Sequence, residues 1–114
     1  MINLKRVIGG KVPAGLDLIE DEEPTLENIR SQLVTEGQFN SPLYLKWCNE
    51  MREKARYHRK QWEFVYTLQT LDQAGLLREG SRGLGFGVGK EPLPAVMAKY
   101  GCRVLATEIN IESP

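Results

Sequence analysis

Glycine stands at every second position of the segment GLGFGVG, residues 83–89, and the charged, proline-rich sequence KEPLP follows directly. Glycine loses more backbone freedom than any other residue when it becomes ordered. A segment with so many glycines is therefore either a flexible loop or a turn whose backbone takes shapes, or approaches a partner, that a Cβ would prevent. The residues on either side decide between these two possibilities.

A strand, a helix and a second strand are predicted around the glycines. The sequence SRGLGF, residues 81–86, is short and apolar enough for a strand, and PLPAVMAKY, residues 92–100, predicts a helix that Gly101 ends. The following CRVLATEI, residues 102–109, reads as another strand. Its residues 104–106 are apolar without alternation, which is typical of a parallel strand covered on both faces. The order strand, glycine loop, helix, strand and carboxylate indicates a βαβ unit.

The first helix expected ahead of this unit covers residues 26–36. Thr25 is a suitable N-cap and Gly37 a suitable stop. Leu26 and Leu33, with Ile29 between them, recur at spacings of three and four residues, which predicts one apolar stripe along a helix.

A longer helical region is expected from Ser41, as N-cap, and Pro42, at the first helical position, to Gly75 as C-terminal cap. Whether residues 42–74 form one bent helix or two is open at this stage. A break near Tyr57 is expected, because continuous helices of this length are uncommon in small domains. The domain prediction is thus a weakly ordered lead-in over 1–24, helices over 25–78, and the βαβ unit over 79–114.

Composition narrows the classes of function. The 114 residues suffice for one domain, and fifteen basic residues balance fifteen acidic ones, which removes the simplest electrostatic argument for nucleic acid or an anionic membrane. Cys48 and Cys102 match no zinc spacing, and with His58 as the one histidine a metal site is not expected. No segment approaches the length of apolar sequence that spans a bilayer. Free thiols without a secretory signal indicate a cytoplasmic protein.

Two familiar nucleotide loops do not fit the glycine segment. A phosphate-binding P-loop needs Ser or Thr after Gly-Lys, whereas Glu91 follows Gly89 and Lys90 here, and its carboxylate would repel phosphates. A dinucleotide loop G-x-G-x-x-G fails from either start, because Val88 and Lys90 occupy the position of the third glycine.

The spacing G-x-G-x-G at Gly85, Gly87 and Gly89 resembles motif I of the class I S-adenosylmethionine-dependent methyltransferases. In that family the loop after the first strand wraps the methionine part of the cofactor, and an acidic residue at the end of the second strand binds the ribose hydroxyls. Glu108 stands in that place, nineteen residues after Gly89. A carboxylate can accept two hydroxyl donors, and the missing Cβ atoms let a cofactor lie against the backbone.

The resemblance extends over residues 57–109, from YHRKQWEFVY to LATE, and is to a bacterial subgroup with a helical segment before motif I. It implies an α/β fold, in which N-terminal helices precede the first βαβ unit of a Rossmann-like domain. Two strands are not independently stable, so the domain is expected to be incomplete, the front of a methyltransferase rather than a whole one. The implied cofactor contacts come from the loop and the second strand: Gly83, Gly85, Phe86, Gly87, Gly89, Glu91 and Glu108.

One position departs from the family pattern. An acidic residue often precedes the first loop glycine by two positions and orients the amino group of the cofactor, but Gly83 stands there in this chain. Glu91 could supply that charge from the other side of the loop. Alternatively it is a carboxylate favoured by the positive end of the following helix.

Three residues of the helical segment are candidates to cover the pocket, each with a plainer alternative. Tyr57 and Trp62 lie on or near the apolar ridge, which favours core packing over contact with a cofactor. His58 has no visible acidic partner, so a surface or packing role is favoured over general base or lid. A further group of cations could grip an anionic substrate, although interleaved glutamates favour a solvated helix face: Arg52, Lys54, Arg56, Arg59 and Lys60.

Two classes of function therefore remain. The first is an S-adenosylmethionine-dependent methyltransferase, or its cofactor-binding N-terminal portion, with an acceptor and catalytic residues that the sequence does not identify. The second is a non-catalytic helical interaction module with a vestigial nucleotide-binding fold. An open parallel edge could pair with another copy of the chain in either case.

Overall fold

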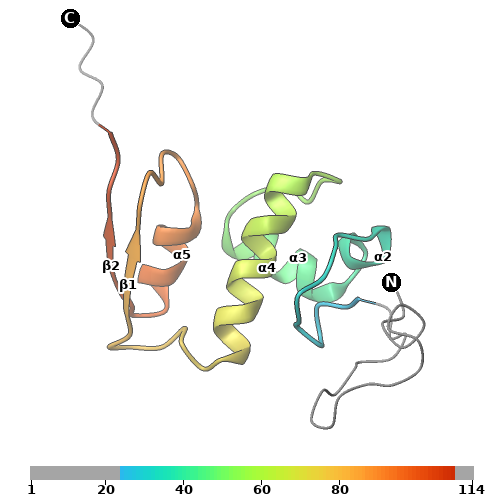
Figure 1. Cartoon of the computed structure of the whole chain (residues 1–114), viewed down its shortest axis with the longest axis horizontal. Coiled ribbons are helices and arrows are strands. Elements are labelled where there is room, and N and C mark those ends of the chain that lie inside the picture. Colours follow the sequence, from blue (N-terminus) through green and yellow to red (C-terminus); the bar gives the residue numbers. More distant parts are fainter. Residues whose placement is uncertain (1–23, 110–114) are drawn as a thin grey trace, which may run out of the picture.

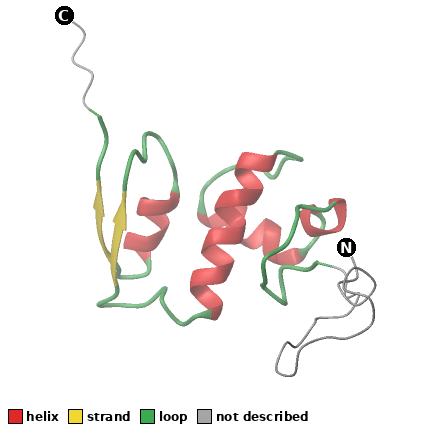
Figure 2. Ribbon diagram, in the orientation of Figure 1, coloured by secondary structure: helices red, strands yellow, loops and turns green. Residues whose placement is uncertain are grey.

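The computed structural model describes residues 24–109, which form a helical part and a βαβ unit lying side by side (Figures 1 and 2). The predicted lead-in lies outside the described residues except for Pro24. The elements in chain order are α2 (Glu36–Phe39), α3 (Pro42–Glu50), α4 (Arg59–Gln73), β1 (Arg82–Gly85), α5 (Leu93–Lys99) and β2 (Arg103–Ala106). Within residues 24–109, no helix is both long enough and apolar enough to cross a membrane.

The long helical region is two helices, and the expected break is present. Pro42 opens α3, where the Ser41 Oγ accepts a hydrogen bond of 3.2 Å from the backbone N–H of Leu43. After a loop over residues 51–58, His58 caps α4 through its Nδ1. The helix ends before Gly75, whose φ of +70° confirms the predicted glycine cap.

The apolar core lies mainly between α3 and α4. Buried side chains of α3, α4 and the segments next to them form one hydrophobic cluster, and α5 contributes one buried side chain to it. Its buried members are Leu26, Tyr44, Trp47, Cys48, Met51, Trp62, Val65, Leu68 and Val96.

The helix predicted over residues 26–36 is wrong. Thr25 does accept the hydrogen bond expected of an N-cap, from the N–H of Asn28 to its Oγ1 at 3.2 Å, but the chain does not continue as a helix. The buried Gln38 donates to the carbonyls of Pro24 and Leu33, and so holds this segment as a loop. Leu26 is fully buried whereas Leu33 is 83% exposed, so the apolar stripe does not form.

The βαβ unit has the predicted parallel arrangement. Strands β1 and β2 pair in parallel, with Gly83 opposite Val104 and Leu84 opposite Leu105. Helix α5 joins them, and Gly101 ends it with a φ of +87°. A Cβ on Gly101 would stand 2.9 Å from the backbone Cα of Glu79, so this position needs glycine.

The prediction that the second strand is covered on both faces is wrong in this structure. Leu84 and Leu105 are register partners and therefore point to the same face of the sheet. They are 59% and 65% exposed, because nothing within residues 24–109 packs over that face. The two-stranded sheet is open, and only the face toward α5 is covered.

Helix α5 links the unit to the helical part. Its Val96 is buried in the common core, and the ring of Tyr100 lies 6.1 Å from that of Trp47. The Lys99 ammonium donates to the Glu50 carboxylate at 2.7 Å, which ties the end of α5 to the end of α3.

Candidate functional site

The glycine turn follows β1 and is held against the carboxyl end of β2. Thr107, the first residue after β2, donates to the carbonyl of Gly85 from its backbone N–H at 2.8 Å and from its Oγ1 at 3.2 Å. The N–H of Val88 returns a hydrogen bond of 3.1 Å to the Thr107 carbonyl. Sequence reasoning missed Thr107, although a hydroxyl residue just after the strand was a usable signal.

Two of the three motif glycines have conformations that favour glycine. Gly87 has a φ of +58° and Gly89 a φ of +51°, both in the left-handed region. A Cβ on Gly87 would meet open space, so its conformation alone accounts for glycine there. The turn then closes through a hydrogen bond of 2.9 Å from the Glu91 N–H to the Val88 carbonyl.

Close packing accounts for the third motif glycine. Gly85 ends β1 in a conformation open to any residue, but a Cβ there would lie 2.8 Å from the Cγ1 of Val88. Real Cβ atoms essentially never come so close, so the turn folds back onto the strand only where this side chain is absent.

The Glu108 carboxylate lies over the turn. Its Oε1 accepts a hydrogen bond of 2.9 Å from the N–H of Ile109, and its Oε2 stands 3.3 Å from the point that a Cβ would occupy on Gly89. Residue 108 is exposed. A solvent-accessible carboxylate therefore lies beside a backbone turn that carries no side chain at residues 87 and 89.

Gly83 lies apart from the turn. It sits within β1, where a Cβ would make an ordinary contact of 3.7 Å with the side chain of Val104. Together with Leu71, Leu77 and Met97 it lines a cavity of about 300 Å³ between the strands and the end of α4. Nothing in its surroundings requires glycine, and its contact with a cofactor stays a prediction.

Phe86 and Glu91 border the turn. Phe86 follows β1 directly and is 78% exposed. Glu91 is half-buried just before α5, and its carboxylate makes no hydrogen bond or ion pair within the described part of the chain. Both interpretations of Glu91, contact with a cofactor or charge near a helix start, remain open.

The three candidate cover residues do not form one group. Trp62 is buried in the core, where its ring lies 5.0 Å from that of Tyr66, as the packing alternative predicts. Tyr57 is 69% exposed and donates from its hydroxyl to Asn40, so the packing alternative is wrong for this residue. His58 is exposed and caps α4.

Neither cysteine has the surroundings of a reactive thiolate. Burial raises the pKa of the Cys48 thiol to about 11. Cys102 is half-buried, and its Sγ donates to the carbonyls of Leu76 and Arg78. Across residues 24–109, no three side chains of His, Cys, Asp or Glu are close enough together to hold a metal ion.

Comparisons with protein-family models, with curated proteins and with solved structures find no match to this chain.

Proposed function

We propose that the glycine turn and Glu108 bind S-adenosylmethionine, and that the chain is the cofactor-binding part of a class I methyltransferase. The observation that carries this proposal is the position of the Glu108 Oε2 beside Gly89. In a parallel βαβ unit, ligands bind outside the carboxyl ends of the strands, and both residues lie at that end.

The chemistry of the residues fits the cofactor. The Glu108 carboxylate would accept hydrogen bonds from the two ribose hydroxyls, since an ionised carboxylate has several acceptor positions. The bare backbone at Gly87 and Gly89 would lie against the methionine part, because a Cβ would fill that space. When bound, the cofactor supplies a methyl group that its sulfonium has already activated.

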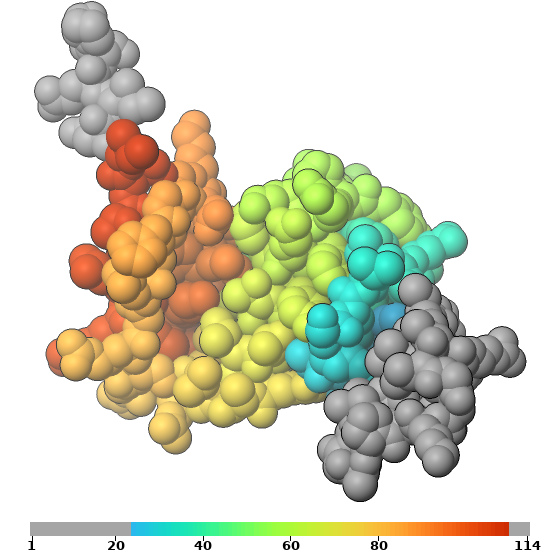
Figure 3. All heavy atoms as spheres, in the orientation of Figure 1, coloured from blue at the N-terminus to red at the C-terminus, as the bar shows by residue number. Residues whose placement is uncertain are grey.

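The shape of the molecule at this end also supports a ligand site. The carboxyl ends of the strands and the start of α4 lie at the same end of the molecule (Figure 1). The space-filling view has a notch there, between the orange turn and the green end of the helical part (Figure 3). Methyl transfer requires chiefly that acceptor and cofactor be held in the correct geometry, so the proposal assigns no acid or base.

The alternative function, an interaction module that assembles through its sheet, has an observation of its own. Leu84 and Leu105 are exposed on one face of the sheet, next to Arg82 and Arg103, and parallel sheets are normally covered on both faces. The two functions separate on binding. Titration of the chain with S-adenosylhomocysteine, with NAD and the Glu108→Ala variant as controls, tests the methyltransferase proposal.

A further inference from the structure

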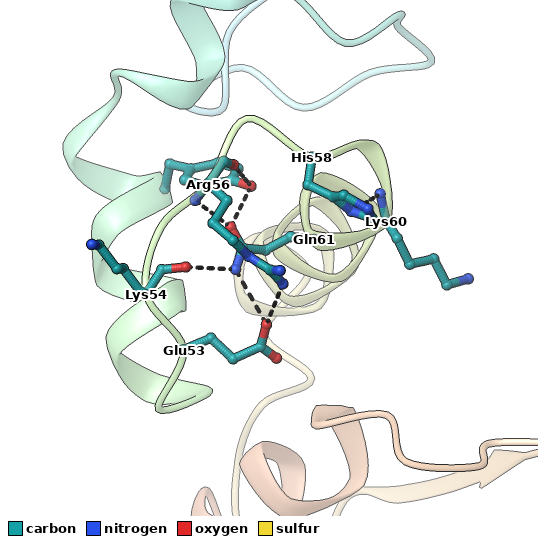
Figure 4. Close-up of polar contacts among 7 residues, drawn as sticks. Glu53, Lys54, Arg56, His58, Lys60 and Gln61 are labelled. Atoms are coloured by element: carbon teal, nitrogen blue, oxygen red, sulfur yellow. Dashed lines mark hydrogen bonds and ion pairs between the residues drawn. The ribbon is translucent and has the colours of Figure 1, made fainter.

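The loop between α3 and α4, residues 51–58, is held from beneath by one buried amide. Gln61 is 2% exposed, and its Oε1 accepts from the N–H of Arg56 at 2.8 Å and from the Tyr44 hydroxyl at 3.1 Å. Its Nε2 donates to the Lys54 carbonyl at 3.0 Å and to the Glu53 carboxylate at 3.2 Å (Figure 4). The side chain thus fixes the loop at three successive points.

This network turns the acidic residue of the loop inward and leaves the cations outside. The Glu53 side chain is 29% exposed, since its carboxylate accepts a hydrogen bond from Gln61 and forms an ion pair of 3.7 Å with Arg56. Figure 4 shows the ammonium groups of Lys54 and Lys60 pointing away from the buried amide. Arg52 and Lys54 make no ion pair with any residue that the structure describes.

The charges of this segment do not cancel. Residues 52–63 contain five Lys or Arg against two Glu, a net charge of +3 in a chain that is neutral overall. Glu63 is shared between Arg59, at 3.9 Å, and Lys60, at 3.2 Å. The glutamates between the cations had indicated a solvated helix face, but they do not neutralise this surface. The segment up to residue 58 is a loop, and the Glu53 carboxylate points inward to Gln61.

An exposed aromatic residue belongs to the same loop as Arg52 and Lys54. Tyr57 is 69% exposed, and its position is fixed by a hydrogen bond of 3.0 Å to Asn40 and by the ring of Phe39, 5.1 Å away. Exposed aromatic rings beside Lys and Arg are the combination with which proteins bind single-stranded nucleic acid, since bases stack on the ring while cations follow the phosphates.

From this placement we propose that residues 52–60 form a binding surface for single-stranded nucleic acid. Arg52 and Lys54 contact phosphates, as do Arg59 and Lys60 in the first turn of α4. Tyr57 stacks with a base. The aromatic ring favours nucleic acid over an acidic peptide, which has phosphate-like charge but no base to stack. The inference does not depend on binding of a cofactor at the glycine turn.

The test is fluorescence anisotropy with a labelled 12-nucleotide poly(U) RNA, titrated with the whole chain at several salt concentrations. Four phosphate contacts would lower the affinity about 50-fold between 50 and 200 mM salt. The variant Arg52→Asn/Lys54→Gln should reduce that loss to about 7-fold, since two contacts are gone. Asn replaces Arg52 because residue 52 has a φ of +57°, in the left-handed region that Asn tolerates.

The control Arg82→Gln/Arg103→Gln removes two exposed arginines from the paired strands and should bind RNA as the wild type does. Tyr57→Ala should weaken binding at least about fivefold, whereas Tyr57→Phe, which keeps the ring, should retain it. The proposal is overturned if the chain does not bind RNA, or if the control loses as much affinity as the loop variant. It is also overturned if Tyr57→Ala has no effect on affinity, or if a 12-residue poly-glutamate peptide competes as well as unlabelled RNA.

Discussion

The Oε2 of Glu108 stands 3.3 Å from the point where Gly89 would carry a Cβ, so the end of β2 reaches over the turn that follows β1. This relationship depends on the parallel pairing of the two strands, which brings their carboxyl ends to one edge. It also depends on Thr107, whose two hydrogen bonds to Gly85 hold the strand end in place.

The packing of the turn against β1 is expected to be sensitive to one methyl group. In Gly85→Ala the new Cβ would meet Val88 at 2.8 Å, and overpacking of this kind costs about 1–3 kcal/mol in the free energy of unfolding. The penalty should largely disappear in the double variant Gly85→Ala/Val88→Ala, because the opposing methyl group is gone.

Gly83→Ala is the matched control within the same strand, since its Cβ would make only ordinary contacts. Urea unfolding of wild type, Gly85→Ala, Val88→Ala, the double variant and Gly83→Ala gives the comparison, with Val88→Ala as the reference for the double variant. If Gly85→Ala destabilises the protein equally in the wild-type and Val88→Ala backgrounds, the close contact with Val88 is not the reason for glycine at residue 85.

The ion pair between α5 and α3 should make stability depend on acidic pH. The hydrogen bond from Lys99, aided by that from Tyr100, holds the pKa of Glu50 below its usual 4.5. A carboxyl whose pKa is lower in the folded state stabilises the fold above its unfolded pKa, and that contribution is lost as the pH falls through the folded pKa.

The measurement is the free energy of unfolding of wild type and Glu50→Gln between pH 7 and pH 2. The wild type should be more stable at neutral pH, and the gap should close in the acidic range. Because Lys99 is 64% exposed, 1 M salt should also narrow the gap at pH 7. A gap that stays constant down to pH 2 would contradict the assignment.

The sequence predicted those elements whose local signals agree with their tertiary contacts. Ser41 and Pro42 start α3, Gly75 ends α4 and Gly101 ends α5. Each of these signals acts on the backbone next to it and needs no distant partner. The absence of a helix over residues 26–36 was not predictable from the cap residues, because it depends on the side-chain amide of Gln38, which binds the carbonyls of Pro24 and Leu33.

The candidate site divides in the same way. That Glu108 and Gly89 would lie close together follows from strand order alone, since parallel strands end at one edge. The burial of Trp62 depends on side-chain packing, which a spacing pattern does not contain. The inward turn of Glu53 likewise depends on a buried glutamine eight residues further along the chain.

Gln61 is expected to be a main determinant of the loop conformation. Gln61→Leu removes partners from the Arg56 N–H and the Lys54 carbonyl, and leaving such groups unsatisfied costs about 1–3 kcal/mol. Gln73→Leu removes an exposed hydrogen bond of 2.7 Å from the same helix to the Glu27 carbonyl. It should destabilise the fold less than Gln61→Leu does, since water can satisfy that exposed carbonyl.

Hydrogen exchange reports the local effect of Gln61. The Arg56 amide should exchange faster in Gln61→Leu at a pH where the variant is still folded, since its acceptor is gone. Unchanged protection of that amide would mean that the loop is held by other contacts.

The exposed face of the sheet gives the alternative function its own test. If a second copy covers Leu84 and Leu105, sedimentation velocity should show mass above the 12.9 kDa of one chain as concentration rises. Leu84→Lys/Leu105→Lys should remain monomeric, whereas Leu33→Lys, which changes an exposed leucine outside the sheet, should still associate. A wild type that stays monomeric at all concentrations would count against assembly through this face.

The most direct test of the central claim is isothermal titration of the folded chain with S-adenosylhomocysteine, with NAD as the control ligand. The proposed function predicts binding of the former alone, and affinity more than about tenfold weaker in Glu108→Ala, or about 1.4 kcal/mol. Glu79→Ala, another exposed carboxylate outside the turn, should bind as the wild type does. Absence of binding by the folded chain, or equal affinity with and without the Glu108 carboxylate, would contradict the assignment of this turn as the cofactor site.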